Sequence, residues 1–269
     1  SNIWFTNEIT EDPESTDINY VFSGSRTQSS VNEFLYMGGG VGIGDFNNNG
    51  RQDIFFAGNQ VSSRLYLNIE TSDGNLRFED ITEKAGITTD VWATGVSIAD
   101  INNDGFSDIY VCVYGGKNLL FIHNGNTESP GFTEQAELYG LADSGDSTQA
   151  IFFDYDKDGL VDLFLVNLRL NGPNPNMLIP RDRSGSSPAN DRLYKNMGQA
   201  ADGQTPVFKD VTDHAGIAGN GYALGVVATD VNNDGWPDIY VANDYLYSDE
   251  LWLNNADGTF TNVADQAMR

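Results

Sequence analysis

A nine-residue motif that occurs four times constrains this chain more than any other feature of its sequence. The copies read DFNNNGRQD from Asp45, DINNDGFSD from Asp100, DYDKDGLVD from Asp154 and DVNNDGWPD from Asp230. Their first residues lie 55, 54 and 76 positions apart. A repeat of this length indicates a supersecondary unit that is built several times along the chain.

Each copy of the motif has the same surroundings. A short apolar segment precedes it, and a β-branched and aromatic run follows it, such as GGGVGIG and IFFAG around the first copy. Two further strand-like runs, RLYLN and FEDIT in the first copy, complete the unit. Four short antiparallel strands per unit predict an all-β fold, a β-propeller of four-stranded blades.

The spacing inside the unit is constant. From Phe78, Phe132 and Phe208, which open the fourth strand-like runs, the next motif begins 22 residues later in each case. A β-sandwich with accidental similarity between its segments is the alternative fold, and it does not explain this constancy. The repeats predict a single β-propeller region over residues 1–269, with blades at about 38–82, 93–136, 147–212 and 222–264 and an outer strand of another blade at 1–9.

The third unit contains an insertion. Asp162 to Tyr194 spans 32 residues, whereas the equivalent interval spans 13 or 14 residues in the other units. The insertion, at 169–192, lies between the second and third predicted strands. It is either a binding loop on a rigid scaffold or a Pro-, Asn- and Ser-rich excursion. In this acidic chain its basic residues stand out: Arg169, Arg181, Arg183 and Arg192.

The net charge argues against some partners. The chain has 14 Lys and Arg against 39 Asp and Glu, a formal charge of −25. Such a balance argues against nucleic acid or an anionic membrane as the main partner and favours bound cations. A solubilising acidic surface is the alternative, but many of the acids recur at regular motif positions rather than in runs.

Several other chemistries lack the residues they need. Cys112 is the single cysteine, so no disulfide can form within the chain, and its apolar surroundings favour a core position. His123 and His214 have no second His or Cys at ligand spacing, which argues against a zinc site. No apolar stretch approaches the roughly 18 residues of a membrane helix, and no signal peptide opens the sequence.

The residue types within the motif suit a hard divalent cation. Ca²⁺ takes six to eight oxygen ligands, and positions 1, 3, 5 and 9 offer Asp or Asn oxygens while position 7 offers a backbone carbonyl. An EF-hand would add a bidentate Glu at position 12 between two helices. Position 12 is instead apolar and strand-like in all four copies: Phe56, Val111, Leu165 and Val241. The motif therefore predicts a calcium loop that joins two adjacent strands of a blade.

Carboxylate counts differ among the four loops. The first loop has two, the second and fourth have three, and the third has four. Since ligand charge tunes calcium affinity, the count predicts tightest binding at the third loop and weakest at the first. The alternative for each copy is an Asx-rich turn that holds no metal.

The repeat resembles the FG-GAP or VCBS repeats of integrin α-subunit propellers, and especially the cartilage-acidic-protein-like group of bacterial secreted and surface proteins. The phrases that carry the resemblance are MGGGVGIGDFNNNGRQDIFFAGN, RLYLN, FEDITEKAGI and FKDVTDHAGI. The likeness covers nearly the whole chain except residues 10–33 and the insertion. It implies a calcium-stabilised propeller, usually of seven blades, in which the ions are structural; with four blades visible, we expect this chain to be part of a longer polypeptide.

Carried over by position, the resemblance implies up to four structural Ca²⁺ ions and no catalytic residue. Asn49 stands where the pattern prefers Asp. The expected side-chain ligands are Asp45, Asn47, Asn49 and Asp53; Asp100, Asn102, Asp104 and Asp108; Asp154, Asp156, Asp158 and Asp162; and Asp230, Asn232, Asp234 and Asp238. The expected carbonyl ligands are Arg51, Phe106, Leu160 and Trp236.

Calcium sites of this kind favour an exported protein. Extracellular calcium is millimolar, whereas weak sites would stay empty in the cytosol. We expect a non-enzymatic binding or scaffold module at the cell surface, in a bacterial envelope assembly or as an adhesin, with any signal or lipid anchor outside this sequence. Its partner would be another surface protein or a glycan. Aromatic residues that could contact a glycan are Trp92, Tyr222, Trp236, Tyr245 and Tyr247.

The alternative function is a calcium-assisted polysaccharide lyase or hydrolase on a propeller scaffold. Such an enzyme needs an acid and a base that converge outside the regular loops. The acids outside the motifs show no distinctive spacing in the sequence. Those considered are Asp143, Asp146, Asp244, Asp249 and Glu250. A third possibility is a rigid spacer within a larger complex.

Overall fold

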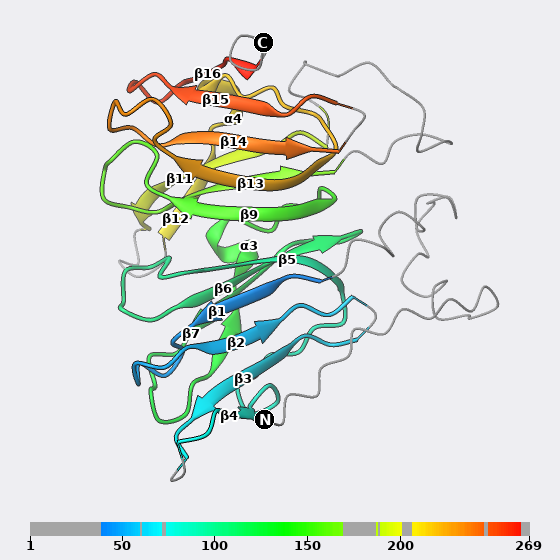
Figure 1. The fold of residues 1–269 in the computed structure, drawn as a ribbon, viewed down its shortest axis with the longest axis vertical. Coiled ribbons are helices and arrows are strands. Elements are labelled where there is room, and N and C mark those ends of the chain that lie inside the picture. Colours follow the sequence, from blue (N-terminus) through cyan, green and yellow to red (C-terminus); the bar gives the residue numbers. More distant parts are fainter. Residues whose placement is uncertain are drawn as a thin grey trace, which may run out of the picture. The chain divides into compact units, whose positions relative to one another are not determined.

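The structure is a computed structural model, and it describes residues 39–59, 61–71, 74–168, 187, 189–200, 206–244 and 247–264. The chain divides into two compact units, residues 1–136 and 137–269, and each unit is described by itself. Figure 1 shows that the regular secondary structure of the described residues is almost entirely β-strand. Among its helices, none is long and apolar enough to cross a membrane.

The first unit contains two four-stranded antiparallel sheets. In each sheet the strands lie in chain order, so every strand pairs with its sequence neighbour. One sheet comprises β1 (Val41–Gly44), β2 (Asp53–Phe56), β3 (Arg64–Ile69) and β4 (Arg77–Asp80). The other comprises β5 (Trp92–Ala99), β6 (Asp108–Tyr114), β7 (Leu119–His123) and β8 (Phe132–Glu134).

The second unit repeats this arrangement with two more sheets of the same order. One sheet comprises β9 (Ser147–Phe153), β10 (Asp162–Asn167), β11 (Arg192–Gln199) and β12 (Pro206–Asp210). The other comprises β13 (Ala223–Thr229), β14 (Asp238–Asn243), β15 (Glu250–Asn254) and β16 (Phe260–Asn262). The predicted all-β fold of four-stranded antiparallel blades is confirmed.

Two sequence-based expectations fall mainly on residues that the structure does not describe. The outer strand predicted at 1–9 lies outside the described residues. The insertion predicted at 169–192 falls between β10 and β11, and of it the structure describes residues 187 and 189–192.

Each nine-residue motif connects the first strand of a sheet to the second. The residue that ends the first strand pairs with motif position 9, which begins the second strand. The four pairs are Gly44 with Asp53, Ala99 with Asp108, Phe153 with Asp162, and Thr229 with Asp238. The motif is therefore the connection of a β-hairpin.

A tight helical turn follows the fourth strand in three of the sheets. Two of these turns form the one-turn helices α3 (Ala136–Tyr139) and α4 (Thr212–Ala215). Each turn ends at a glycine with positive φ, where an L side chain would be strained. These glycines are Gly86, Gly140 and Gly216, and the apolar residue after each, Ile87, Leu141 or Ile217, is fully buried. His214 therefore lies on a helix.

The apolar faces of the strands form a hydrophobic core within each unit. In the first unit, Phe55, Leu65 and Ile109 pack with Phe46, which is motif position 2. In the second unit the equivalent Tyr155 packs with Phe164, Leu193 and Trp252. Position 2 thus anchors these two loops to the core.

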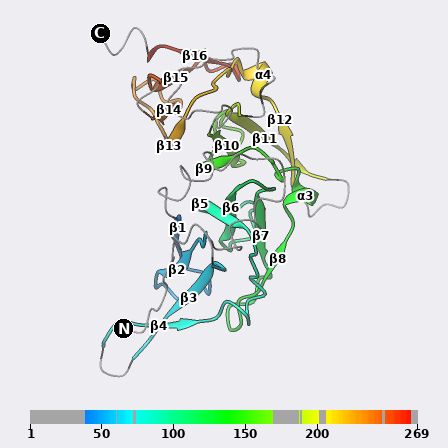
Figure 2. The same ribbon diagram turned by 90° about the vertical axis from the view of Figure 1, so that its right-hand side faces the viewer.

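Neighbouring first strands approach closely within each unit. β9 and β13 lie side by side in both views (Figures 1 and 2), and Thr148 Oγ1 donates a hydrogen bond of 2.7 Å to the carbonyl oxygen of Ala223. In the first unit a Cβ on Gly40, just before β1, would lie 2.8 Å from the backbone nitrogen of Val96 on β5. Close approach of two backbones therefore explains a glycine of the GGGVGIG segment.

Gly40→Ala is expected to destabilise the first unit because the added methyl group meets backbone atoms that cannot turn away. Overpacking of this kind lowers the free energy of unfolding by about 1–3 kcal/mol. Urea denaturation measures the change. Gly116→Ala is the matched control, because its Cβ would meet no backbone atom within 4 Å and a single side-chain atom, Val113 Cγ1, at 3.3 Å. Equal unfolding midpoints for the two variants would contradict the close approach.

Candidate metal site: four acidic loops

Motif position 9 is a buried aspartate whose two carboxylate oxygens connect three parts of the sheet. One oxygen accepts the backbone N–H of position 2, and the other accepts a backbone N–H from the third strand. The position 2 donors are Phe46 (2.8 Å), Ile101 (3.0 Å), Tyr155 (3.2 Å) and Val231 (3.0 Å). The third-strand donors are Asn68 (2.7 Å), His123 (2.8 Å), Asn196 (2.8 Å) and Asn254 (2.8 Å).

Positions 1 and 5 fold the loop back on itself. The position 1 carboxylate accepts the backbone N–H groups of positions 5 and 6, as Asp100 does from Asp104 (3.0 Å) and Gly105 (2.8 Å). The position 5 side chain accepts the N–H of position 7, here Phe106 at 2.9 Å. The other three loops have the same bonds. The side-chain oxygens at positions 1, 5 and 9 therefore line one turn in every copy.

Two residues in each loop have left-handed backbone conformations. Position 6 is glycine, with φ between 81° and 89°, as the sequence predicted. Position 4 also has positive φ, which the sequence analysis did not predict. Its residues are Asn48 (52°), Asn103 (57°), Lys157 (60°) and Asn233 (60°), and asparagine tolerates this conformation better than most residues.

Position 3 differs among the loops. Asn102 and Asn232 each accept the N–H of position 5 through Oδ1 and donate Nδ2–H to its carboxylate. In the first loop, Asn47 Oδ1 is buried and has no hydrogen-bond partner, and in the third loop the same holds for Asp156 Oδ1. Because a buried polar oxygen without a partner is costly, these two atoms are among those in the loops that could hold a cation.

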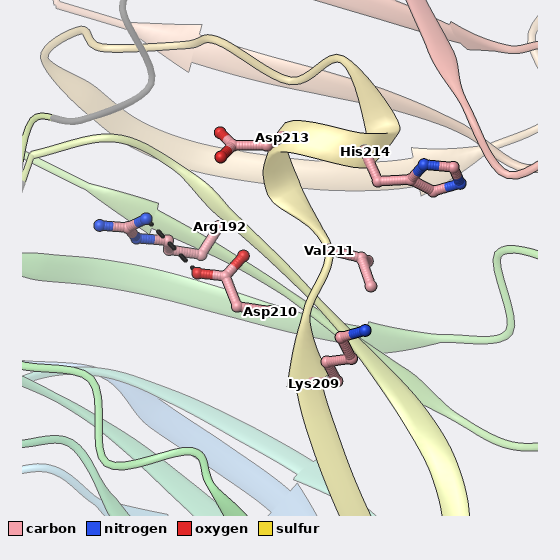
Figure 3. Close-up of a pocket in the computed structure, with 6 residues that line it drawn as sticks. All are labelled: Arg192, Lys209, Asp210, Val211, Asp213 and His214. Atoms are coloured by element: carbon pink, nitrogen blue, oxygen red, sulfur yellow. Dashed lines mark hydrogen bonds and ion pairs between the residues drawn. The ribbon is translucent and has the colours of Figure 1, made fainter.

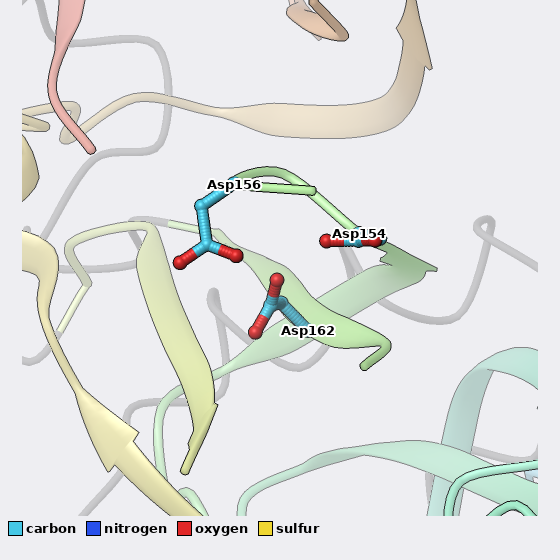
Figure 4. Close-up of side chains that lie close together, drawn as sticks. All are labelled: Asp154, Asp156 and Asp162. Carbon is cyan, nitrogen blue, oxygen red and sulfur yellow. The ribbon is translucent and has the colours of Figure 1, made fainter. Parts of the chain in front are cut away.

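The third loop has the highest negative charge, and a lysine side chain from the strand β11 reaches into it. Asp154, Asp156 and Asp162 each offer a carboxylate oxygen, and these oxygens lie within 4.8 Å of one another. Figure 4 shows the three side chains together on one side of the loop. Lys195 of β11 places Nζ against Asp156 Oδ2 and 2.9 Å from Asp158 Oδ2.

Burial raises the pKa of three carboxylates at position 9. Loss of solvent raises the pKa of Asp53, and it raises the pKa of Asp108 and of Asp162 to about 7. Burial lowers the pKa of Lys195, but its bonds to Asp156 and Asp158 outweigh burial and leave this pKa above its ordinary value. Lys195 therefore stays charged within the loop.

Consecutive loops touch one another within each unit. Position 4 of the first loop, Asn48, donates a hydrogen bond of 3.2 Å to the carbonyl of Gly105 in the second loop. In the second unit position 4 of the third loop, Lys157, places its ammonium 4.4 Å from the ring centroid of Trp236 in the fourth loop. Within each unit, the two loops thus form a polar surface at the ends of two neighbouring sheets.

An open pocket of about 460 Å³ lies elsewhere in the second unit, beside β11, β12 and α4. Figure 3 shows Arg192 paired with Asp210, at 3.4 Å, while the imidazole of His214 projects away from both. Among the described residues that line this pocket, neither Asp210 nor Asp213 points its carboxylate toward His214.

The acids that an enzyme would need outside the loops take part in structural bonds. Asp143 accepts a hydrogen bond of 2.7 Å from the Tyr194 hydroxyl, and Asp249 accepts the hydroxyl of Tyr240 and the N–H of Asn243. Glu250 accepts the indole N–H of Trp252 at 3.1 Å. Asp146 and Asp244 also have interactions within the fold. Asp143, Asp249 and Glu250 therefore act as internal hydrogen-bond acceptors.

Two of the five candidate glycan-binding aromatic residues are buried in the core. Trp92 is buried and packs edge-on against Tyr114, with ring centroids 6.3 Å apart. Tyr222 is buried and stacks on Tyr247 at 5.2 Å. Trp236 is half-buried in the fourth loop, and Tyr245 lies outside the described residues. Trp92 is therefore not a glycan contact.

His123 also has a structural role. The ring stacks on Phe106 with centroids 4.7 Å apart, and its Nδ1 accepts the N–H of Gly125 at 2.9 Å. Burial lowers its pKa, so the imidazole is neutral near pH 7. It supports the second loop through the aromatic side chain at position 7.

Besides the positive φ at position 4, two features of the site were not predicted from the sequence. The third-strand residue that bonds position 9 is Asn in three copies, and the recurring final Asn of RLYLN, RLYKN and ELWLN could have indicated it. Lys195 was also visible in RLYKN, since the equivalent residues of the other copies are apolar. That Lys195 contacts Asp156 could not be predicted without the strand register.

Together, the fold and the loops define a class: an all-β chain of four-stranded blades, each with an acidic hairpin loop between its first two strands. The family described as FG-GAP-like repeat matches residues 45–111, 102–165 and 230–268, which is more than half of the chain. The chain belongs to this family of repeat proteins, as the resemblance in its sequence predicted.

Curated relatives named cartilage acidic protein 1 are similar over part of their length. The Xenopus tropicalis protein is 30% identical over 146 residues, covering 53% of this chain and 22% of that protein. The Mus musculus protein is 29% identical over 178 residues, covering 63% of this chain and 26% of that protein. The chain spans about a quarter of the length of these relatives.

A solved structure, the Tc holotoxin pore of Photorhabdus luminescens, is similar at 14% identity with a TM-score of 0.34. The alignment covers 83% of this chain and 9% of that one. Nothing about activity or partners follows from this likeness.

Asp108→Asn is expected to destabilise the chain even without metal, because the new amide group cannot accept both the Ile101 and the His123 N–H groups. One buried donor left unsatisfied costs about 1–3 kcal/mol. Urea denaturation in EDTA at pH 8 measures this loss. The exposed Asp90→Asn is the control, with a change within about 0.5 kcal/mol. A Asp108→Asn variant as stable as this control would show that the double acceptor is unimportant.

Proposed function

We propose that this chain is a calcium-stabilised, non-enzymatic binding or scaffold module that acts outside the cell. It would work at a cell surface, as a component of an envelope protein assembly or as an adhesin, with a surface protein or a glycan as its partner. The observation that carries the proposal is that all four loops fold into the same hydrogen-bonded turn. The side-chain atoms that could bind a metal in these turns are all oxygen atoms of Asp and Asn.

The residues present fit Ca²⁺. Hard cations prefer carboxylate and amide oxygens, and these stand at positions 1, 3, 5 and 9 of every loop. The buried Asn47 Oδ1 without a partner is the kind of atom that a cation would satisfy. When bound, Ca²⁺ supplies positive charge that offsets crowded carboxylates and favours their ionised form. The chain's own N–H groups hold those carboxylates in place before any ion binds.

Extracellular action is supported by the type of site and by the family. Short loops with some neutral ligands suit millimolar calcium, which is found outside cells. FG-GAP-like repeats and the similarity to cartilage acidic proteins favour a binding or scaffold role over catalysis. The structural bonds of Asp143, Asp249 and Glu250 support the same reading, because these three acids already accept hydrogen bonds within the fold.

Calcium binding at the fourth loop can be read through Trp236, which occupies position 7. Tb³⁺, a luminescent substitute for Ca²⁺, is expected to emit on tryptophan excitation, and excess Ca²⁺ should abolish the signal. Asp230→Ala should remove it, because it deletes a donor and frees the N–H groups of Asp234 and Gly235. The exposed Asp213→Ala should retain it.

A second variant separates metal binding from its optical signal. Trp236→Phe should lose the emission while keeping the calcium stoichiometry measured by calorimetry. Calcium should also raise the melting temperature of the wild-type chain, and EDTA should reverse the rise. An unchanged melting temperature together with no calorimetric heat would refute the calcium proposal.

The distinction between binding and catalysis has its own test. Acidic polysaccharides incubated with the calcium-loaded chain should stay intact, with no unsaturated or reducing ends formed. The same chain should bind surface proteins or glycans on an array in calcium and release them in EDTA. Turnover that EDTA abolishes would replace the scaffold proposal with the lyase or hydrolase.

A further inference from the structure

Lys195 occupies an unusual place for a basic side chain in this acidic protein. Its Nζ contacts Asp156 Oδ2 and lies 2.9 Å from Asp158 Oδ2, so it bridges positions 3 and 5 of the third loop. The ring of Tyr155, at position 2, lies 6.0 Å from the same nitrogen. The side chain is 24% exposed. It therefore forms part of the loop and is not an exposed surface lysine.

The strand register places this lysine at one defined position of the repeat. It precedes Asn196, whose N–H bonds the position 9 carboxylate of the third loop. The residues that precede the same donor in the other sheets are all apolar. They are Leu67, Ile122 and Leu253. The third sheet alone among the four described has a cationic residue at this point.

The third loop is also the most negatively charged. It has four aspartates at positions 1, 3, 5 and 9, against two in the first loop. Three of these carboxylates have oxygens within 4.8 Å of one another. Charges this close repel strongly in a partly buried site unless a cation lies among them. The Lys195 ammonium is a compact charge on a flexible stem, which suits that place.

We propose that Lys195 is the resident cation of the third loop, so that this loop closes without calcium and binds it more weakly than its carboxylate count implies. The calcium part of this inference rests on the proposed function. A divalent ion that uses Asp156 and Asp158 must first displace the ammonium or share those oxygens with it. The number of carboxylates alone predicts the tightest calcium site at the third loop, because it does not include the competing Lys195 ammonium.

The first arm of the test uses no calcium. In EDTA, wild-type amide exchange should be slow at Asp158, Gly159 and Leu160, whose N–H groups donate within the loop. Lys195→Leu should accelerate exchange there by about tenfold or more, because it leaves the clustered carboxylates without a counter-charge. Lys209→Leu, which removes an exposed lysine from the neighbouring strand β12, should leave these amides unchanged.

The second arm measures calcium directly. Lys195→Leu should tighten binding at the third loop by about tenfold or more, or add one calcium to the stoichiometry found by calorimetry and native mass spectrometry. Lys209→Leu changes the net charge equally and should do neither. Leu253→Lys is the reverse exchange in the fourth sheet. It should weaken the Trp236-sensitised Tb³⁺ signal by about tenfold or more.

The outcomes separate the two proposals. The role of Lys195 would be overturned if amide exchange in EDTA were equally slow in Lys195→Leu and in the wild type. It would also be overturned if the third loop of the wild type bound calcium most tightly of the four. If no loop binds calcium, the proposed function fails, yet the exchange arm still decides whether Lys195 closes the loop. If Lys195→Leu does not fold, Leu253→Lys decides: an unchanged Tb³⁺ signal would also overturn the inference.

Discussion

The buried aspartate at motif position 9 is the interaction on which each sheet depends. Asp53, Asp108, Asp162 and Asp238 are all nearly inaccessible to solvent, and each accepts one N–H from its own loop and one from the third strand. A buried carboxylate is tolerated only when such bonds replace its lost hydration. One side chain therefore fixes the loop, the hairpin and the next strand in a single register.

The first and third loops are coupled to the core because positions 2 and 9 are joined by a hydrogen bond. The N–H of Phe46 donates to Asp53 while the Phe46 ring packs in the core. Tyr155 and Asp162 repeat this arrangement in the second unit. A change in loop conformation thus disturbs apolar packing, and the loop geometry is kept although its surface residues vary.

The same backbone turn occurs with three different arrangements of polar and charged side chains around position 3. The second and fourth loops use Asn102 and Asn232 to bond the position 5 carboxylate. The first loop leaves Asn47 Oδ1 without a partner, and the third loop admits Lys195. The repeats are alike in the hydrogen bonds of positions 1, 5 and 9 but differ in how they balance charge, so the motif alone does not determine the electrostatics of a loop.

Much of this protein was determined by local sequence. The four loops, their glycine at position 6 and the strands around them follow from short-range spacing and backbone sterics, which need no tertiary context. The tertiary structure decided which oxygens are already bonded, that Trp92 packs in the core, and that Lys195 meets Asp156 across the interval containing the insertion. These features depend on strand register and burial, because groups distant in sequence meet only when the sheets pack, and a repeat pattern does not encode that meeting.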